Sequence, residues 1–210
     1  MNYTVIDVEN WERRDLFRLY TGDLRIVMNL TVDIDVTNLI AFAKRHGLKF
    51  YPVMIWVVAK LMNARDEFKY SLRPDGTLIR WDTVSPSYTD FDPETEKFNK
   101  FVTEYADDVF TFCERAEADR VKYKGQVGFV PDQPKNVFDI SCLPWTHYKG
   151  LDLHIYGDGK SLFPIVIWGK YTEQDGKQLL PVTMMFHHAC GDGFHLSRFF
   201  EELQATIDAR

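Results

Sequence analysis

A buried strand that turns through a histidine pair into an amphipathic helix, near the end of the chain, constrains the fold most. Residues 179–186 are mostly apolar, which is typical of a buried strand. Apolar residues recur at helical spacing over residues 194–207, which predicts a helix with one buried face. His187 and His188 stand between the two elements. A strand-to-helix corner can hold a reactive side chain rigidly, so this corner is the first candidate for a functional site.

The residues of the corner suit acid–base chemistry. The imidazole of His188 can act as a general base near neutral pH. Gly191 and Gly193 are expected to supply backbone angles that other residues resist. Asp192 between them can cap the following helix or pair with a cation. A histidine pair alone favours a structural role, but the spacing His-His-x-x-x-Asp-Gly between a strand and a helix favours catalysis.

Size and charge narrow the function classes. The 210 residues fit one domain, 1–210, large enough to bury a core. The formal net charge is −6 without a basic block, which argues against nucleic acid or an anionic membrane as a partner. No apolar run is long enough to span a bilayer, and no signal peptide is evident. Cys113, Cys142 and Cys190 lack metal-site spacing, so we expect no metal site and reduced thiols in a cytoplasmic protein.

Hydrophobic periodicity predicts interspersed helices and strands. Helices are expected at residues 11–20, 37–47, 52–62, 106–123 and from 194 to near the C-terminus. Strands are expected at residues 25–33, 70–81 (a hairpin), 85–91, 137–143, 151–155, 163–168 and 179–186. Thr37 is the expected cap of the second helix, and the turn at Asp175-Gly176 predicts that the last two strands pair antiparallel. This pattern predicts an α+β fold, a two-layer sandwich in which helices pack on one face of a mixed β-sheet.

The corner motif and several other stretches resemble one known family. The motif at residues 187–195 resembles the HHxxxDG signature of the chloramphenicol acetyltransferase family. Condensation domains of peptide synthetases and the acyltransferase cores of 2-oxoacid dehydrogenase complexes carry related motifs. The stretches that also look like the chloramphenicol enzymes, in their order, are 10–14, 49–54, 95–98, 140–145 and 169–171. The resemblance covers essentially the whole chain and implies an acetyl-CoA-dependent O-acetyltransferase.

The resemblance implies a role for each catalytic candidate. His188 would take the proton of an acceptor hydroxyl, which then attacks the thioester of acetyl-CoA directly, without an acyl-enzyme. Ser141 would donate a hydrogen bond to the oxyanion, a contact worth roughly 2.7–4 kcal/mol of the barrier. Without the resemblance, Ser141 would be interpreted as an ordinary strand serine. Asp192 would pair with Arg13 and hold the corner; on its own it fits a solvated helix cap equally well. A homotrimer with sites between subunits is implied too.

Binding positions follow from the same resemblance. Those implied to line the coenzyme A tunnel are Lys49, Tyr51, Lys170 and Tyr171. Lysines there suit the phosphates, and tyrosines suit the pantetheine arm or adenine. Those implied to line the acceptor pocket are Tyr20, Thr89, Phe98, Leu153 and Ile167. His187 and His195 are expected in structural or pocket-lining roles, and His46, His147 and His154 as plain polar residues.

Several positions depart from the family pattern. Leu19 and Met28 stand where aromatic residues are usual, and Ile26 where a small or thiol residue is. Ile167 replaces a threonine that binds a water, and Asp139 stands where asparagine is common. Lost stacking and a lost water site predict measurable but weak acetylation of chloramphenicol. Two alternatives remain open: the same catalyst on another small hydroxylated acceptor, and a non-catalytic binding protein that retains the fold.

Overall fold

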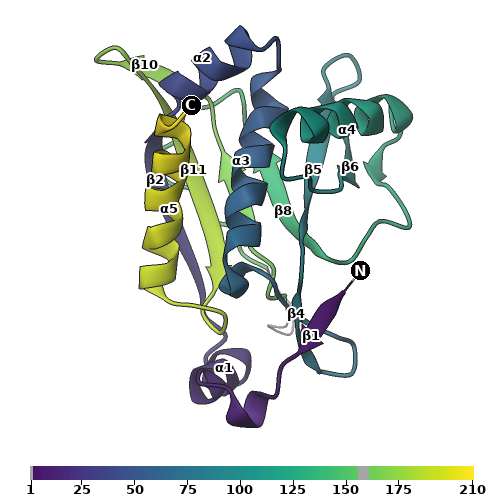
Figure 1. Cartoon of the computed structure of the whole chain (residues 1–210), viewed down its shortest axis with the longest axis vertical. Coiled ribbons are helices and arrows are strands. Elements are labelled where there is room, and N and C mark those ends of the chain that lie inside the picture. Colours follow the sequence, from purple (N-terminus) through teal and green to yellow (C-terminus); the bar gives the residue numbers. More distant parts are fainter. Residues whose placement is uncertain (1, 156–160) are drawn as a thin grey trace.

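A mixed β-sheet with helices on one face forms the body of the molecule (Figure 1). The computed structural model describes residues 2–155 and 161–210. The helices are α1 (Arg14–Thr21), α2 (Thr37–Arg45), α3 (Phe50–Ala64), α4 (Val109–Lys122) and α5 (Gly193–Asp208), with 3-10 turns η1 (Val8–Asn10) and η2 (Asp66–Phe68). The strands are β1 (Tyr3–Val5), β2 (Val27–Asp35), β3 (Tyr70–Leu72), β4 (Leu78–Trp81), β5 (Ser85–Asp92), β6 (Lys97–Val102), β7 (Gly128–Phe129), β8 (Val137–Cys142), β9 (Ile165–Trp168), β10 (Thr172–Gln174) and β11 (Lys177–His187).

The main sheet mixes parallel and antiparallel pairs. Its hydrogen-bonded order is β10, β11, β9, β8, β5, β6, β7, and β2 pairs with β11 as well. β8 runs parallel to β5 and β9, whereas β11 runs antiparallel to β2, β9 and β10. A three-stranded sheet of order β1, β4, β3 forms at one end of the molecule (Figure 1). The mixed sheet with its single helical layer confirms the expected α+β sandwich.

α3 is the centre of the helical layer. Pro52 lies in its first turn, where the missing N–H costs no helical hydrogen bond. Residues 53–59 are all buried, because α3 packs against α2, α4 and α5; Figure 1 shows it between α4 and α5. A helix that is apolar nearly all round needs such enclosure, as its sequence predicted. Among the described residues, no helix is both long and apolar enough to cross a membrane.

Residues 151–155 form no strand, so that prediction is wrong. Both edges of β9 are already paired, one with β8 and the other with β11, which leaves the segment no partner strand there. Leu151 and Leu153 instead pack against a small buried cluster that β9 and β11 contribute. Their alternation reflects packing onto a sheet face, which carries the same sequence period as membership of the sheet.

Two turns also differ from expectation. Thr37 does not cap α2, because the N-cap residue is Val36. The Asp35 carboxylate accepts hydrogen bonds from the N–H and the hydroxyl of Thr37, at 3.0 and 2.6 Å, and so holds the start of the helix. The turn at Asp175 joins β10 to β11, and the predicted antiparallel pairing of β9 with β11 occurs further along β11.

Candidate active site

The corner between β11 and α5 is held by short-range hydrogen bonds. β11 ends at His187, and α5 begins at Gly193. The N–H of His188 donates to the carbonyl of Ile26, just before β2, at 3.0 Å. The His187 ring is buried, and its Nδ1 accepts a hydrogen bond from the N–H of Ala189 at 3.2 Å. The ring of His187 is therefore held inside the corner, and the backbone N–H of His188 is held by Ile26.

The imidazole of His188 has one nitrogen engaged and one available. Its Nδ1 lies 3.0 Å from the carbonyl oxygen of Gly191. A carbonyl only accepts, so this contact assigns a proton to Nδ1, and in the neutral imidazole the lone pair is then on Nε2. The ring stacks on Tyr20, with centroids 4.0 Å apart and planes 12° from parallel. The side chain is therefore held in the tautomer that a general base needs.

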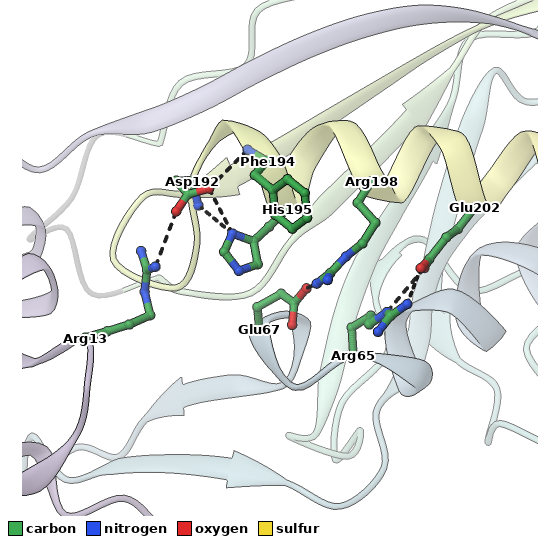
Figure 2. A network of polar contacts seen from close by, with 8 residues as sticks. All are labelled: Arg13, Arg65, Glu67, Asp192, Phe194, His195, Arg198 and Glu202. Carbon is green, nitrogen blue, oxygen red and sulfur yellow. Dashed lines mark hydrogen bonds and ion pairs between the residues drawn. The ribbon is translucent and has the colours of Figure 1, made fainter.

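Asp192 and Arg13 meet across the corner (Figure 2). Arg13 Nη1 lies 3.5 Å from Asp192 Oδ2, and Arg13 Nη2 donates to the carbonyl of His188 at 3.3 Å. The other oxygen of Asp192 accepts from the N–H of Phe194 at 3.0 Å, which caps α5. The pair that the resemblance implied is present, and so is the helix cap that was its alternative. One carboxylate does both, and Arg13 links it to the backbone of the histidine.

His195 completes the capping box of α5. Its Nδ1 lies 3.0 Å from Asp192 Oδ1 and 3.2 Å from the N–H of Asp192. Burial acts to raise the pKa of Asp192, but the contact with His195, the N–H of Phe194 and the charge of Arg13 outweigh it. The pKa of Asp192 therefore lies below its ordinary value. The carboxylate is therefore ionised at neutral pH.

Gly191 is required because a side chain would not fit there. The sequence predicted instead that Gly191 and Gly193 supply unusual backbone angles. Neither Gly191 nor Gly193 has a positive φ. A Cβ on residue 191 would lie 2.5 Å from Cε1 of Phe186, a fully buried ring. A Cβ on residue 193 would meet nothing within 4 Å. Only Gly191 is therefore sterically required at this corner.

A cavity of about 500 Å³ lies at the end of the sheet's central strands that is opposite to the corner of His188. It is lined by Phe50, Tyr51, Thr89, Asp90, Phe91, Cys142, Pro144, Trp145, Trp168, Gly169, Lys170 and Tyr171. Three of the four residues implied for coenzyme A are among them, and Ser141 precedes Cys142 on β8. Tyr51 donates from its hydroxyl to the carbonyl of Thr89 at 2.9 Å, and burial raises its pKa. The cavity therefore brings together Tyr51, Thr89, Lys170 and Tyr171.

The remaining predicted positions are spread around this frame. Lys49, just before α3, pairs with Glu117 at 3.1 Å. Phe98 on β6 is 47% exposed. Leu153 lines a smaller cavity of about 360 Å³ beside Ile26, on the His188 side. Ile167 is buried within the cluster of β9 and β11. No group of three or more His, Cys, Asp or Glu side chains in residues 2–155 and 161–210 is placed to hold a metal ion.

Ser141 and His188 of one chain lie far apart. Ser141 pairs with Ile167 on β9, and Ile167 pairs with Thr183 on β11. An antiparallel strand rises roughly 3.4 Å per residue, so the step from Thr183 to His188 spans about 17 Å. Two strand spacings of about 4.8 Å separate Ser141 from β11 in addition. One small reacting group cannot touch both side chains of the same chain.

Comparison with known proteins places the chain in a family. The family model described as chloramphenicol acetyltransferase matches residues 1–204. The chain belongs to the chloramphenicol acetyltransferase family. A chloramphenicol acetyltransferase of Clostridium perfringens is 37% identical over 97% of this chain and 94% of its own length. Chloramphenicol acetyltransferase 2 of Haemophilus influenzae is 35% identical over 99% and 98%. A solved structure titled chloramphenicol acetyltransferase superposes with a TM-score of 0.86 over 98% of this chain and all of its own, at 22% identity, and shows the fold.

For this member of the chloramphenicol acetyltransferase family, sequence reasoning missed several ionic contacts near the site. Lys100 on β6 pairs with Asp139 on β8 at 2.6 Å, with side chains only 16% and 19% exposed. Glu117 on α4 pairs with Lys49. The partners come from different elements, so no local spacing signals either pair. Asp139 was visible in the sequence as a departure, but its cation was not.

Proposed function

We propose that this chain transfers the acetyl group of acetyl-CoA to a hydroxyl of chloramphenicol or a similar small acceptor, with His188 as general base. The contact between His188 Nδ1 and the carbonyl of Gly191 carries the proposal, because it leaves Nε2 free to take a proton. The names of the relatives supply the substrates: both are chloramphenicol acetyltransferases. Acetylation of the antibiotic would make this a resistance enzyme.

The reaction needs one proton transfer in each direction. Nε2 of His188 takes the hydroxyl proton as the acceptor oxygen attacks the thioester carbonyl, which forms a tetrahedral oxyanion. The hydroxyl of Ser141 donates to that oxyanion. When the carbon–sulfur bond breaks, the imidazolium returns the proton to the leaving thiolate, and ester and coenzyme A are released. Arg13 and Asp192 are positioning residues, since they act through the backbone of His188.

Acetyl-CoA would enter through the cavity of about 500 Å³. Its apolar walls suit the pantetheine arm, and Tyr51 and Tyr171 offer aromatic faces. Lys170 at the cavity and Lys49 next to it are cations for the phosphates. The thioester would then lie near Ser141, which adjoins the cavity through Cys142.

The site would be completed by a second copy of the chain. Since Ser141 and His188 of one chain are separated by about 17 Å or more along the sheet, the serine of one subunit would face the histidine of its neighbour. Tyr20 would belong to the histidine side, and Thr89 and Phe98 to the serine side. A cyclic homotrimer gives equivalent sites of this kind. Sedimentation equilibrium should then report about three times the chain mass of 24.6 kDa.

One observation favours an acceptor other than chloramphenicol. Asp139 lies two residues before Ser141, so both side chains project from the same face of β8. The ion pair of Asp139 with Lys100 therefore places charges beside the oxyanion serine. Covering the part of this ion pair that is still exposed with an aryl group costs solvation. Together with Ile167 in place of a water site, this supports slow turnover of chloramphenicol and faster turnover of a more polar hydroxylated acceptor.

An assay of thiol release with acetyl-CoA and a panel of hydroxylated acceptors tests the proposal. His188→Ala should lower kcat by about 10²–10⁴, the usual loss for a general base, and should leave acetyl-CoA binding almost unchanged. Retention of most of kcat in the folded variant would contradict the role of His188. Absence of thiol release from the unaltered protein with every acceptor would favour the non-catalytic alternative.

The free cysteines fit a cytoplasmic location.

A further inference from the structure

A single carboxylate holds two cations beside the proposed coenzyme A cavity. Lys49 Nζ lies 3.1 Å from Glu117 Oε2. Arg120, one turn further along α4, donates from Nε to the same oxygen at 3.0 Å and from Nη2 to Oε1 at 2.6 Å. Arg120 therefore binds the Glu117 carboxylate in a bidentate contact, whereas Lys49 makes a single contact with it.

This cluster borders the cavity. Phe50 and Tyr51, which follow Lys49, line it. Asp90 lines both this cavity and a neighbouring one of about 470 Å³, to which Arg120 contributes. Burial raises the pKa of Asp90, and the charges of Arg120, Glu117 and Lys49 are close enough to act on it. The charged groups of Lys49, Glu117 and Arg120 thus lie close to residues that line the cavity.

Glu117 and an incoming phosphate would compete for Lys49. The hydrogen bonds of Arg120 and Lys49 lower the pKa of Glu117 to about 2, so its carboxylate is ionised at any working pH. The side chains of Lys49 and Glu117 are 67% and 47% exposed, and an exposed ion pair exchanges partners at little cost. Arg120 would keep the carboxylate paired after Lys49 has turned to a phosphate.

The geometry points to Glu117 and Arg120 as the residues that set how strongly the coenzyme A site selects for the 3′-phosphate. Glu117 competes with that phosphate for Lys49, and Arg120 weakens the competition by holding Glu117. We assign the 3′-phosphate to Lys49 because this phosphate is a dianion and lies at the end of coenzyme A furthest from the thioester. This inference rests on the proposed function, in which Lys49 meets a phosphate of acetyl-CoA.

Kinetics with acetyl-CoA and acetyl-3′-dephospho-CoA test the assignment, since the two substrates differ only in this phosphate. Glu117→Gln should lower KM for acetyl-CoA roughly two- to five-fold, the range of an exposed ion pair. Arg120→Gln should raise it by a similar factor. Neither change should alter KM for the dephospho substrate. Glu201→Gln, the same charge change at an exposed position of α5, is the matched control and should leave the ratio of the two KM values unchanged.

A double variant separates the two ways in which Arg120 could act. If Arg120 works by holding Glu117, adding Arg120→Gln to Glu117→Gln should change the KM ratio no further. A further rise in the double variant would show that Arg120 binds the phosphate itself and would overturn the assignment. An unchanged KM ratio in Glu117→Gln, or an equal shift for both substrates, would also overturn it. Either result leaves the proposed function intact if the unaltered protein releases thiol, whereas absence of thiol release would contradict the proposed function itself.

Discussion

His188 is oriented by a carbonyl oxygen and an aromatic ring. The acidic residue of the motif, Asp192, makes no hydrogen bond to the imidazole; it reaches His188 through Arg13, which contacts the backbone carbonyl. The atom that sets the tautomer is the oxygen of Gly191. The orientation of the proposed base therefore depends on the position of the Gly191 backbone as well as on Asp192.

A methyl group at residue 191 should damage the site through sterics. In Gly191→Ala the new Cβ would lie 2.5 Å from the buried ring of Phe186, so the ring or the corner must move. Overpacking of this kind costs about 1–3 kcal/mol and would shift the carbonyl that holds His188. We expect a lower Tm and a lower kcat.

Gly193→Ala is the matched control for this prediction. A Cβ at residue 193 meets nothing within 4 Å, and alanine has a higher helix propensity than glycine at this first position of α5. Thermal melting and thiol release should both be close to those of the unaltered protein. Equal damage from both substitutions would show that the corner needs glycine backbones and not the space beside Phe186.

At the scale of elements, the N-terminus of α5 links helix capping to the site. Asparagine caps helices as well as aspartate does, so Asp192→Asn removes the charge and keeps a cap. The folded pKa of Asp192 is lowered, so its charge stabilises the fold fully above the unfolded pKa of about 3.9 and loses that effect as pH falls through the folded pKa. Asp192→Asn should therefore melt below the unaltered protein at neutral pH, and the gap should close in acid.

Thermal melting of both proteins between about pH 3 and pH 7 checks this sign. Asp108→Asn is the control, because Asp108 caps α4 by accepting from the N–H of Thr111 at 2.8 Å, away from the corner. It should leave kcat unchanged, whereas Asp192→Asn should lower kcat by releasing Arg13. A gap between Asp192→Asn and the unaltered protein that widens in acid would contradict the lowered pKa.

Elements with a strong local pattern could be predicted from the sequence. The apolar strand β11, the enclosed helix α3 and the corner between β11 and α5 all carry signals within a short window. Residues 151–155 carry the same alternation but lie on a sheet that has no free edge there. Local periodicity indicates which side chains are buried. Whether a segment also pairs with a strand depends on the rest of the chain, and local periodicity does not indicate it.

Contacts within the site were harder to predict than elements. Arg13 and Asp192 are separated by 179 positions, and only the resemblance to the family joined them. Lys100 and Asp139 are 39 positions apart on strands that flank β5, so their pairing depends on sheet register. Ion pairs between elements leave no periodic trace, and these therefore appear only in the folded structure.

At the scale of the whole molecule, the sheet separates the two halves of the proposed site. β11 delivers His188 at one end, while β8 holds Ser141 beside the cavity. In the described residues the helices lie on one face of the sheet (Figure 1), so in the proposed oligomer a neighbouring subunit would bring the second half to the other face. Oligomer formation would then be a condition of activity, and would not merely add stability.

Mixing two inactive variants tests this arrangement most directly. His188→Ala removes the base, and Ser141→Ala removes the oxyanion donor, which alone should cost about 10²–10³ in kcat. If each site takes His188 from one subunit and Ser141 from the next, an equal mixture that is unfolded and refolded together should restore about one site in four. The same proteins refolded separately and then combined provide the baseline. Thiol release from the co-refolded mixture that stays at this baseline would mean that no site draws on two subunits, and the homotrimer with shared sites would have to be abandoned.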